Sequence, residues 1–332
     1  MEFIGVSKIA GVGAYLPATV VDSASIMEEI GCERFGVSKS YMDKALGIRE
    51  RRVCDRDTAP SDLACAASQR AIEAAGIRPE DLGFIVFCGI DRDWQEPATA
   101  HRVQSLLGAR NASCLDVTNA CHGFIDGMAV ADAFIAAGMV DNVLVCTGER
   151  PSDVMYEYVH KLKKVRSREL FKKWVGMLSA GDAGGAMVIQ RSDDRSGWRN
   201  LRLCSRGQHA ELCHYKRTDK GITGHMLMSE ITSAVLDLHE EMIGNTYDRL
   251  GWAPGDVDWA YLHQSGSAPH RRMIAAAHLD VSRAPVTYEK FGNLTSATIP
   301  VAMALTPPSR GDKLLILGAG SGISVCQGGM IY

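Results

Sequence analysis

Cys121 stands where a short apolar strand is expected to pass directly into an amphipathic helix. Residues 113–117 have the character of a buried strand, and residues 122–137 have the apolar spacing of a helix. The N-terminus of a helix carries partial positive charge, so a thiol placed there is expected to favour its thiolate form. Taken alone, Cys121 is better explained as a small core residue.

Two distant segments contain residues that could work with such a thiol. His263 directly follows the apolar run 259–262, and the ends of strands commonly face an active site. Asn293 follows a glycine and carries an amide that donates hydrogen bonds without titrating. Singly, a core histidine and a turn residue explain them equally well. Together they favour acyl transfer, in which Cys121 takes an acyl group from a thioester while His263 and Asn293 stabilise the enolate-like oxygen of a second thioester.

The composition limits the class of protein. With 332 residues, 46% apolar and 23% charged, the chain suits one large α/β domain or two similar halves. A net charge of −3 gives no indication of nucleic-acid binding. Glu2 and Lys8 interrupt the apolar N-terminus and no apolar run reaches about 18 residues, so neither a secretory signal nor a membrane span is expected. The ten cysteines are scattered, which predicts a cytoplasmic protein.

Metal and dinucleotide sites are not expected. The nearest approach to a metal cluster is formed by Cys204, His209, Cys213 and His214. Their spacing matches no common zinc pattern. The glycines of residues 11–13 and 318–322 do not complete a G-x-G-x-x-G motif between a strand and a helix. Gly320 and Gly322 are instead expected to let the backbone approach an acyl thioester, and no permanently bound cofactor is predicted.

Short β-rich runs alternate with helical patterns, as in an α/β protein. The expected strands include 84–87, 143–146, 186–189 and 314–317, and the expected helices include 62–75 and 229–250.

A weak internal repeat indicates a doubled architecture. The segment 79–84 (PEDLGF) recurs as 254–259 (PGDVDW), 175 residues later. At the same offset, 118–121 falls on 293–296, and each is followed by an apolar helical run. The repeat favours two αβ halves, with the boundary near residues 175 to 200. We place the half with the nucleophile at residues 1–175, and the half with the histidine and asparagine at residues 176–332.

Several motifs, in this order along the chain, resemble those of one family. They are GVGAYLP (11–17), GIRERR (47–52), VQSLLG (103–108), NACHGF (119–124), GDAGGA (181–186), HQ (263–264) and GNLTSATIP (292–300). The chain resembles the thiolase superfamily and, within it, β-ketoacyl-[acyl-carrier-protein] synthase III. The resemblance covers essentially the whole length. It implies a duplicated five-layered αβαβα fold, a homodimer, and a catalytic triad of Cys121, His263 and Asn293.

The resemblance also implies the substrates. They would be acyl groups carried on coenzyme A or on an acyl carrier protein, in fatty acid or polyketide biosynthesis. Arg49 and Tyr41 fall where such enzymes bind coenzyme A. The segment 161–173 holds seven Lys or Arg residues against one Glu, and Lys163, Lys164 and Arg166 in it could attract the phosphates of coenzyme A or an acidic carrier protein. A solvated helix face is the alternative.

Glu96 is a departure from the housekeeping enzymes, which usually have an aromatic or apolar residue there. A glutamate at this place is similar to the thiolase-type enzyme that joins two fatty acyl chains head to head in olefin biosynthesis. By that likeness, Glu96 would act as a base in the active site of the partner subunit, so that condensation need not be decarboxylative. A solvated loop carboxylate is the alternative. The family's usual HQAN also reads HQSG at residues 263–266.

Four functions remain open at this stage. The first is a condensing enzyme that acylates Cys121 and then forms a carbon–carbon bond. The second is an acyltransferase that makes an ester or amide in specialised metabolism. The third is a thioesterase, and the fourth is a non-catalytic partner subunit of a condensing complex. A reversible thiolase that uses Cys326 as acid and base is a further variant, which Asn293 disfavours.

Overall fold

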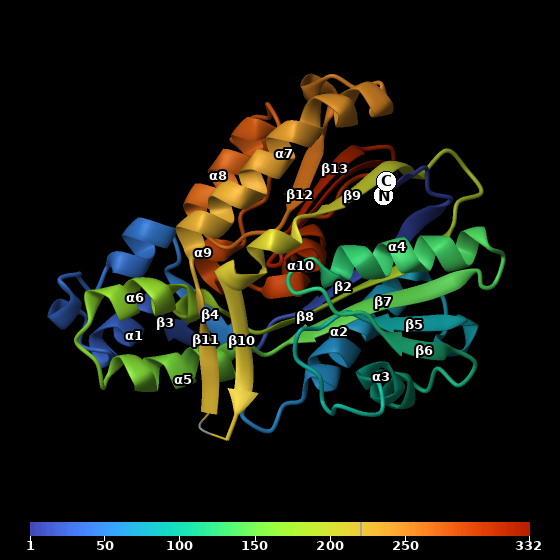
Figure 1. Cartoon of the computed structure of the whole chain (residues 1–332). Helices are drawn as coiled ribbons and strands as arrows, with labels where there is room; N and C mark the ends of the chain where they lie inside the picture. Colours follow the sequence, from blue (N-terminus) through green and yellow to red (C-terminus); the bar gives the residue numbers. More distant parts are fainter. Residues whose placement is uncertain (220) are drawn as a thin grey trace.

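Two five-stranded sheets form the centre of the computed structural model, which describes residues 1–219 and 221–332 (Figure 1). The first sheet has the order β2–β8–β7–β5–β6, which are Ser7–Tyr15, Ala183–Arg191, Asn142–Glu149, Phe84–Phe87 and Ser113–Asp116. The second sheet has the order β1–β9–β14–β13–β12, which are Glu2–Phe3, Gly197–Ser205, Ser324–Ile331, Lys313–Gly320 and Trp259–Leu262.

The two sheets repeat one another. In the first, β2 and β8 are antiparallel, β8 and β7 are antiparallel, and β7 and β5 are parallel. In the second, β9–β14, β14–β13 and β13–β12 follow the same sequence of directions. β5 begins at Phe84 and β12 begins at Trp259. The two strands are therefore 175 residues apart, the same offset as in the sequence repeat. The expected duplicated α/β fold is confirmed. The division at residue 175 stays a prediction; the first sheet takes in β8, which begins at Ala183.

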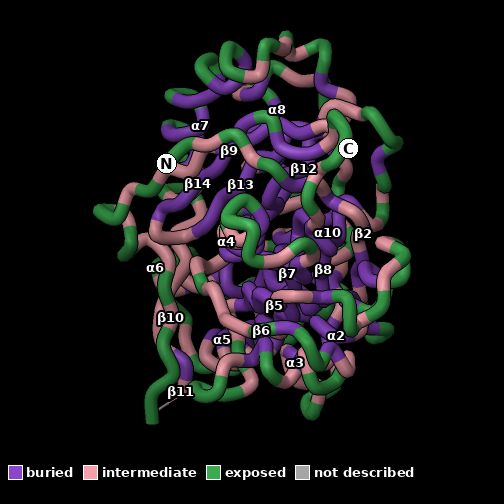
Figure 2. The backbone as a smooth tube through the Cα atoms, turned by 90° about the vertical axis from the view of Figure 1, so that its right-hand side faces the viewer, coloured by how far each residue is buried: buried purple, intermediate pink, exposed green. Residues whose placement is uncertain are grey.

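Helices pack on both sides of each sheet and give the five layers (Figure 1). Helices α2 (Pro60–Ala75) and α3 (Thr99–Leu107) cover the outer face of the first sheet. Helices α7 (Met228–Leu250) and α8 (Ser267–Ala276) cover the outer face of the second. Helices α4 (Gly123–Ala136) and α10 (Thr298–Leu305) lie between the sheets. The sheets accordingly hold much of the buried chain (Figure 2).

A third group of elements lies beside the first sheet and has its own core. It contains helices α1 (Ser23–Glu29), α5 (Ser152–Leu162) and α6 (Arg168–Trp174) and the hairpin of β10 (Cys213–Thr218) and β11 (Gly221–Met226). The pair of β3 (Thr19–Asp22) and β4 (Glu50–Val53) joins it to helix α9 (Tyr288–Phe291). The remaining short helices are η1 (Cys32–Phe35), η2 (Met42–Leu46), η3 (Pro79–Asp81), η4 (Val175–Ser179), η5 (Gly207–Leu212), η6 (Pro254–Asp256), η7 (Val281–Arg283) and η8 (Thr295–Ala297). Among the described residues, no helix has the length and apolarity needed to cross a bilayer.

Glycines let helix α2 lie directly on the first sheet. A Cβ added at Gly148 would lie 1.8 Å from the carbonyl oxygen of Pro60, and one at Gly184 would lie 2.0 Å from that of Leu63. Gly13 faces the next turn of the helix in the same way, with 2.1 Å to the Ala67 oxygen. The helix backbone therefore contacts the sheet without intervening side chains, which fixes the position of β7 and of the residues at its end.

This close approach predicts a large effect of Gly148→Ala on stability. The new methyl group would overlap a backbone carbonyl that cannot move independently, so we expect a loss of about 3 kcal/mol, the upper end of the usual cost of overpacking, in the free energy of unfolding. Gly244→Ala is the matched control. Gly244 lies in α7 with no atom within 4 Å of the added Cβ, and alanine there should stabilise the helix by about 0.5–1 kcal/mol. Urea unfolding of both variants measures the difference; equal stabilities would contradict the packing described here.

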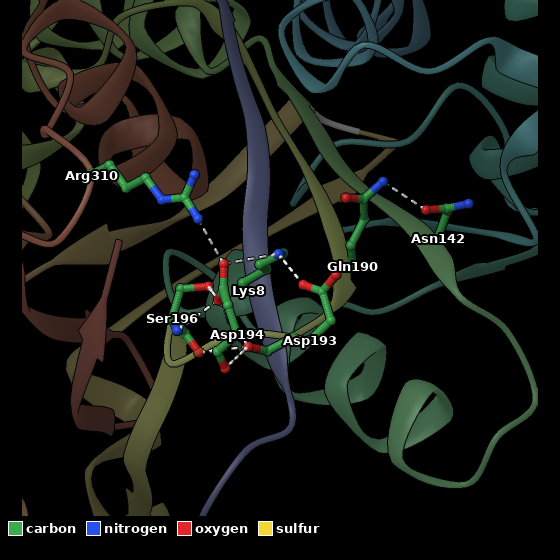
Figure 3. A network of polar contacts seen from close by, with 8 residues as sticks. Lys8, Asn142, Gln190, Asp193, Asp194, Ser196 and Arg310 are labelled. Carbon is green, nitrogen blue, oxygen red and sulfur yellow. Dashed lines mark hydrogen bonds and ion pairs between the residues drawn. The ribbon is translucent and has the colours of Figure 1, made fainter.

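A surface network links strand β2 to the turn between β8 and β9 (Figure 3). Lys8 of β2 lies 2.6 Å from a carboxylate oxygen of Asp193 and 3.5 Å from one of Asp194. Arg310 reaches Asp194 at 3.1 Å from the segment before β13. These pairs are exposed or half-exposed, so each is expected to contribute little to stability.

Candidate active site

The backbone around Cys121 is a tight turn between β6 and α4. Ala120 has a φ of 49°, in the left-handed region that a residue with a Cβ rarely adopts. The turn is closed by the amide of His122, which donates to the carbonyl of Asn119 at 3.0 Å. Thr295, which matches Ala120 in the sequence repeat, has a φ of 51°. Both halves thus use the same strained turn, once to present Cys121 and once beside Asn293.

Two cavities meet at Cys121. The larger has a volume of about 1060 Å³ and is lined by Cys121 and Asn293, among others. The smaller has a volume of about 50 Å³ and is lined by Cys121 and His263. We call them the large and the small compartment. The structure therefore brings the three predicted residues, which are far apart in the sequence, to one place.

Asn293 is held by hydrogen bonds on three sides. The backbone N–H of Asn293 donates to the backbone carbonyl of Ser179 at 2.8 Å. The backbone carbonyl of Asn293 accepts from the backbone N–H of Gly181 at 3.1 Å. Its side-chain oxygen accepts from the amide of Thr295 at 2.9 Å. Since the side-chain oxygen is occupied, the Nδ2 group is the part of Asn293 that can donate to a substrate oxygen.

The thiol of Cys121 is harder to ionise than an ordinary cysteine. Burial raises its pKa, and the negative charges of Cys213 and Glu149 would raise it further. A backbone contact lowers the pKa, but by less than burial raises it. At this position burial therefore opposes the thiolate-favouring effect that is expected of a helix N-terminus. Because removal from water disfavours the charged form, Cys121 is a neutral thiol before it reacts.

His263 is a neutral imidazole. Burial lowers its pKa to about 4, while a backbone contact with Thr295 raises it in part. Its Nδ1 is buried and has no hydrogen-bond partner among the described residues. Because His263 and Cys121 line the same small compartment, the neutral imidazole can accept the proton that the thiol loses when it attacks a thioester.

Glu149 is a site residue that the sequence analysis missed. It ends β7, is 1% exposed and lines the large compartment. The hydroxyl of Ser296 donates a short hydrogen bond to it, and the amide of Ile90 donates at 3.2 Å. Burial raises the pKa of Glu149 to about 8. Its signal was available, since an acidic residue only three positions after the buried run 143–146 is unusual unless it has partners.

Cys213 is a second residue that the sequence analysis did not place in the site. It begins β10 and lines both compartments beside Cys121. Its distance in sequence and the polar character of its strand gave no signal. Among the described residues, no group of three or more His, Cys, Asp or Glu side chains is arranged to hold a metal ion.

Of the two glycines predicted to approach the acyl thioester, only Gly320 lines a compartment. Gly320 lines the small compartment, and a Cβ there would come within 2.8 Å of the backbone nitrogen of His122. A side chain at Gly320 would therefore press on the turn that presents Cys121. Gly322 lies in the turn after β13 with a φ of 129°, and it is not among the residues that line either compartment. Cys326 is fully buried in β14 and also lies outside both linings.

Glu96 is exposed and does not line either compartment of its own chain, whereas Trp94 and Gln95 line the large one. A single chain therefore does not bring Glu96 to Cys121. The prediction that it serves the site of a partner subunit stays a prediction.

The residues predicted to bind coenzyme A lie apart from the two compartments. Arg49 forms an exposed ion pair with Glu289, and the ring of Tyr41 packs edge-on against Phe171. Lys163 pairs with Glu29 at 3.1 Å. Lys164 lines a separate hollow of about 340 Å³ with Lys161 and Trp174, and Arg166 is exposed. Several charges of the basic segment thus have partners within the protein, as on a solvated helix face.

Comparison with known proteins decides the family. The model of the 3-oxoacyl-[acyl-carrier-protein] synthase III family matches residues 115–207, and the model of that family's C-terminal part matches residues 247–330. A β-ketoacyl-[acyl-carrier-protein] synthase III from Methylococcus capsulatus is 31% identical over 89% of this chain and 88% of its own length. The chain belongs to the β-ketoacyl-[acyl-carrier-protein] synthase III family. It is therefore an acyltransferase of the condensing type, and the family predicted from the sequence motifs is confirmed.

Other relatives agree with this assignment. A synthase III from Caldanaerobacter subterraneus is 29% identical over 95% of both chains. Among solved structures, a variant of OleA from Xanthomonas campestris superimposes with a TM-score of 0.91 at 25% identity, over 100% of this chain and 99% of its own. OleA from the same organism was also solved with bound lauric acid and lauroyl-CoA, and at 24% identity that likeness concerns the fold. The thiolase-type five-layered fold predicted for the present chain is thus confirmed.

Proposed function

We propose that the protein transfers an acyl group from a coenzyme A or acyl-carrier-protein thioester to Cys121 and then to a second thioester by Claisen condensation. The observation that carries the proposal is the meeting of Cys121, His263 and Asn293 at the two compartments. The protein would work in the cytoplasm as a homodimer, in fatty acid or polyketide biosynthesis, without a permanently bound cofactor.

The first half-reaction follows from the protonation states. The sulfur of Cys121 attacks the thioester carbonyl, its proton passes to the neutral imidazole of His263, and the thiol of coenzyme A leaves with a proton. The products are an acyl-cysteine thioester and free coenzyme A. Exchange of one thioester for another is nearly neutral in energy, so the acyl group stays transferable.

In the second half-reaction, His263 and the Nδ2 group of Asn293 would donate to the enolate oxygen of the incoming thioester. Its carbon attacks the acyl-cysteine, and Cys121 is released as the leaving group. The carbanion would arise by loss of CO2 from a malonyl-type thioester, or by proton removal by Glu96 of a partner subunit. Donors preorganised at a developing oxyanion commonly contribute about 10²–10³ in rate.

An acyltransferase that forms an ester or amide is the second candidate. The number of charged side chains in the large compartment favours it, because an alcohol or amine acceptor would find hydrogen-bond partners there. A thioesterase or a non-catalytic partner subunit has no comparable observation in its favour.

The proposal is tested with purified protein and a panel of acyl-CoAs. Intact mass should show an acyl adduct, and a malonyl thioester, a second acyl-CoA or a set of alcohols and amines should then remove it with formation of a product. Adduct that decays only to free acid would point to hydrolysis. Absence of an adduct with every donor would point to a non-catalytic subunit.

Glu96→Gln distinguishes the two routes to the carbanion. If Glu96 is the base in trans, the variant should keep the acyl adduct on Cys121 and lose at least about 100-fold in condensation of two acyl-CoAs, in line with general-base catalysis. Condensation with a malonyl thioester should be unchanged, because loss of CO2 replaces proton removal. Trp94→Phe in the same loop is the control for a disturbed loop. Unchanged condensation of two acyl-CoAs by Glu96→Gln would remove Glu96 from the mechanism.

A further inference from the structure

Arg51 is a buried cation that the proposed mechanism does not use. It lies in β4, within the GIRERR motif of residues 47–52, and it is 0% exposed. Burial lowers its pKa to about 10, so the guanidinium is still positively charged at neutral pH. Among the described residues, its hydrogen bonds go only to neutral oxygens. A buried charge without a partner of opposite sign is costly, so a cation at this place needs a reason.

The guanidinium links two parts of the chain that lie on either side of it. Its Nη2 donates to the backbone carbonyl of Leu178, at the end of η4, at 3.0 Å. Its Nη1 donates to the hydroxyl of Ser23, the first residue of α1, at 2.8 Å and to the backbone carbonyl of Val21 at 3.4 Å. Hydrogen bonds from a charged donor are roughly twice as strong as those between neutral groups. The carbonyl of Leu178 is therefore fixed relative to β3 and α1.

The segment that Arg51 holds is the one that carries Asn293. Leu178 directly precedes Ser179, whose carbonyl accepts from the backbone N–H of Asn293 at 2.8 Å. Ala180 and Asn293 then pair as an isolated parallel β-bridge. The backbone of Asn293 thus takes its position from residues 179–181, and these follow directly on the carbonyl that the guanidinium fixes.

The stem of Arg51 packs against the same bridge. A Cβ added at Gly181 would lie 3.0 Å from the Cβ of Arg51, and one added at Gly292 would lie 3.4 Å from it. Gly181 follows Ala180 and Gly292 precedes Asn293, so both strands of the bridge contact Arg51 through residues without side chains. Arg51 therefore lies where three of the family motifs meet, GIRERR, GDAGGA and GNLTSATIP.

We propose that Arg51 is a positioning residue, which fixes residues 178–181 and through them the place at which the Nδ2 group of Asn293 meets the enolate oxygen. This inference rests on the proposed function, in which Asn293 acts in the second half-reaction. A group that acts on a transition state must be held to within about 0.5 Å. Loss of Arg51 should therefore slow condensation and leave acylation of Cys121 unchanged.

The test measures the two half-reactions separately in Arg51→Met, which keeps the length of the side chain and removes its charge and its donors. Intact mass follows acylation of Cys121 and then discharge of the acyl group, with acetyl-CoA and malonyl-CoA or with the pair from the acyl-CoA panel that reacts fastest in the native protein. Condensation should fall by about 10–100-fold, the usual cost of misplacing a catalytic group by up to about 1 Å, while acylation stays within about twofold. Unchanged condensation, or equal losses in both half-reactions, would overturn the inference.

A double-mutant cycle shows whether Arg51 acts through Asn293. Asn293→Ala removes the donor itself and should slow condensation by about 10²–10³-fold. If Arg51 only positions that donor, adding Arg51→Met to Asn293→Ala should change the rate by less than about twofold, because residues that act as one unit are not additive. Losses that multiply would show that Arg51 acts on something else and would contradict the proposal.

Two further variants separate this role from a general loss of structure. Arg51→Lys keeps the charge but replaces the planar fork by one ammonium nitrogen, so condensation should fall by at least about threefold with acylation unchanged. If Arg51→Met does not fold, this variant decides, and a loss that is absent or shared by both half-reactions contradicts the proposal. Glu50→Gln removes the charge of the partly exposed neighbour in β4 and should leave both half-reactions unchanged.

The single variant Asn293→Ala distinguishes failure of this inference from failure of the proposed function. Condensation that is unchanged in Asn293→Ala, or the absence of an acyl adduct with every donor, would overturn the proposed function and this inference with it. Condensation that is slowed in Asn293→Ala but not in Arg51→Met would overturn the inference alone and leave the proposed function intact.

Discussion

Cys121→Ala should abolish the acyl adduct that acyl-CoA donors form with the native protein. The adduct is a thioester, and alanine has no group that can form one, so the loss is expected to be complete within the detection limit of intact-mass measurement. Product formation should fall by at least about 10⁴-fold, because a covalent step that divides one difficult transfer into two is removed. The fold should be unaffected, since alanine fits the same strained turn.

Cys213→Ala is the matched control for this experiment. Cys213 lines both compartments, as Cys121 does, so it is exposed to the same donor, but at the start of β10 it lacks the strained turn that presents Cys121. The variant should keep the adduct. An adduct that survives Cys121→Ala and disappears in Cys213→Ala would identify Cys213 as the nucleophile. That result would overturn the proposed mechanism.

The nucleophile and its two partners were accessible from the sequence because each is tied to a local pattern. The strand 113–117, observed as β6 over Ser113–Asp116, and the helix 122–137, observed as α4, fix where Cys121 lies. The sequence repeat placed Asn293 at the matching turn of the other half, and the similar φ angles of Ala120 and Thr295, 49° and 51°, show the physical basis. The fold followed from the same repeat.

The protonation state of Cys121 and the charges around it could not be predicted from local sequence patterns. The helix N-terminus argued for a thiolate at Cys121, but the degree of burial depends on the β10–β11 hairpin and on the second half, which no local pattern reveals. The charged side chains in the lining of the large compartment have the same origin, since residues from Asp57 to Arg217, up to 160 positions apart, meet around one cavity. The coenzyme A contacts predicted at Arg49 and Tyr41 rested on likeness alone, and the structure gives these side chains partners of their own.

Acylation of Cys121 should be nearly independent of pH on the acidic side of neutrality. His263, with a pKa lowered to about 4, is neutral throughout the usual range, so the rate of Cys121 acylation should stay flat from about pH 5 to pH 7.5. An ordinary histidine would become protonated as the pH falls through its usual value of 6.5, and the rate would fall with it. A decline that begins near pH 6.5 in the native protein would therefore contradict the buried, neutral imidazole.

His263→Ala should reverse this behaviour. Without the base, only the thiolate can attack, and the thiolate is scarce because burial raises the pKa of Cys121. Acylation at pH 7 should fall by about 10²–10⁴, the usual contribution of a positioned base. The residual rate should then rise about tenfold for each pH unit, since the thiolate fraction does so below the pKa. A flat residual rate would mean that some other group takes the proton.

Glu149 should produce a break near pH 8 in the pH–rate profile of the His263→Ala variant. Its pKa is raised to about 8, so it becomes negatively charged as the pH rises through that value, beside a sulfur that must also become negative. Two negative charges that line the same cavity disfavour each other, so the rise in the His263→Ala rate should flatten above about pH 8. Adding Glu149→Gln removes the titrating group and should restore the tenfold slope. A break that persists in the double variant would show that a group other than Glu149 limits ionisation of Cys121.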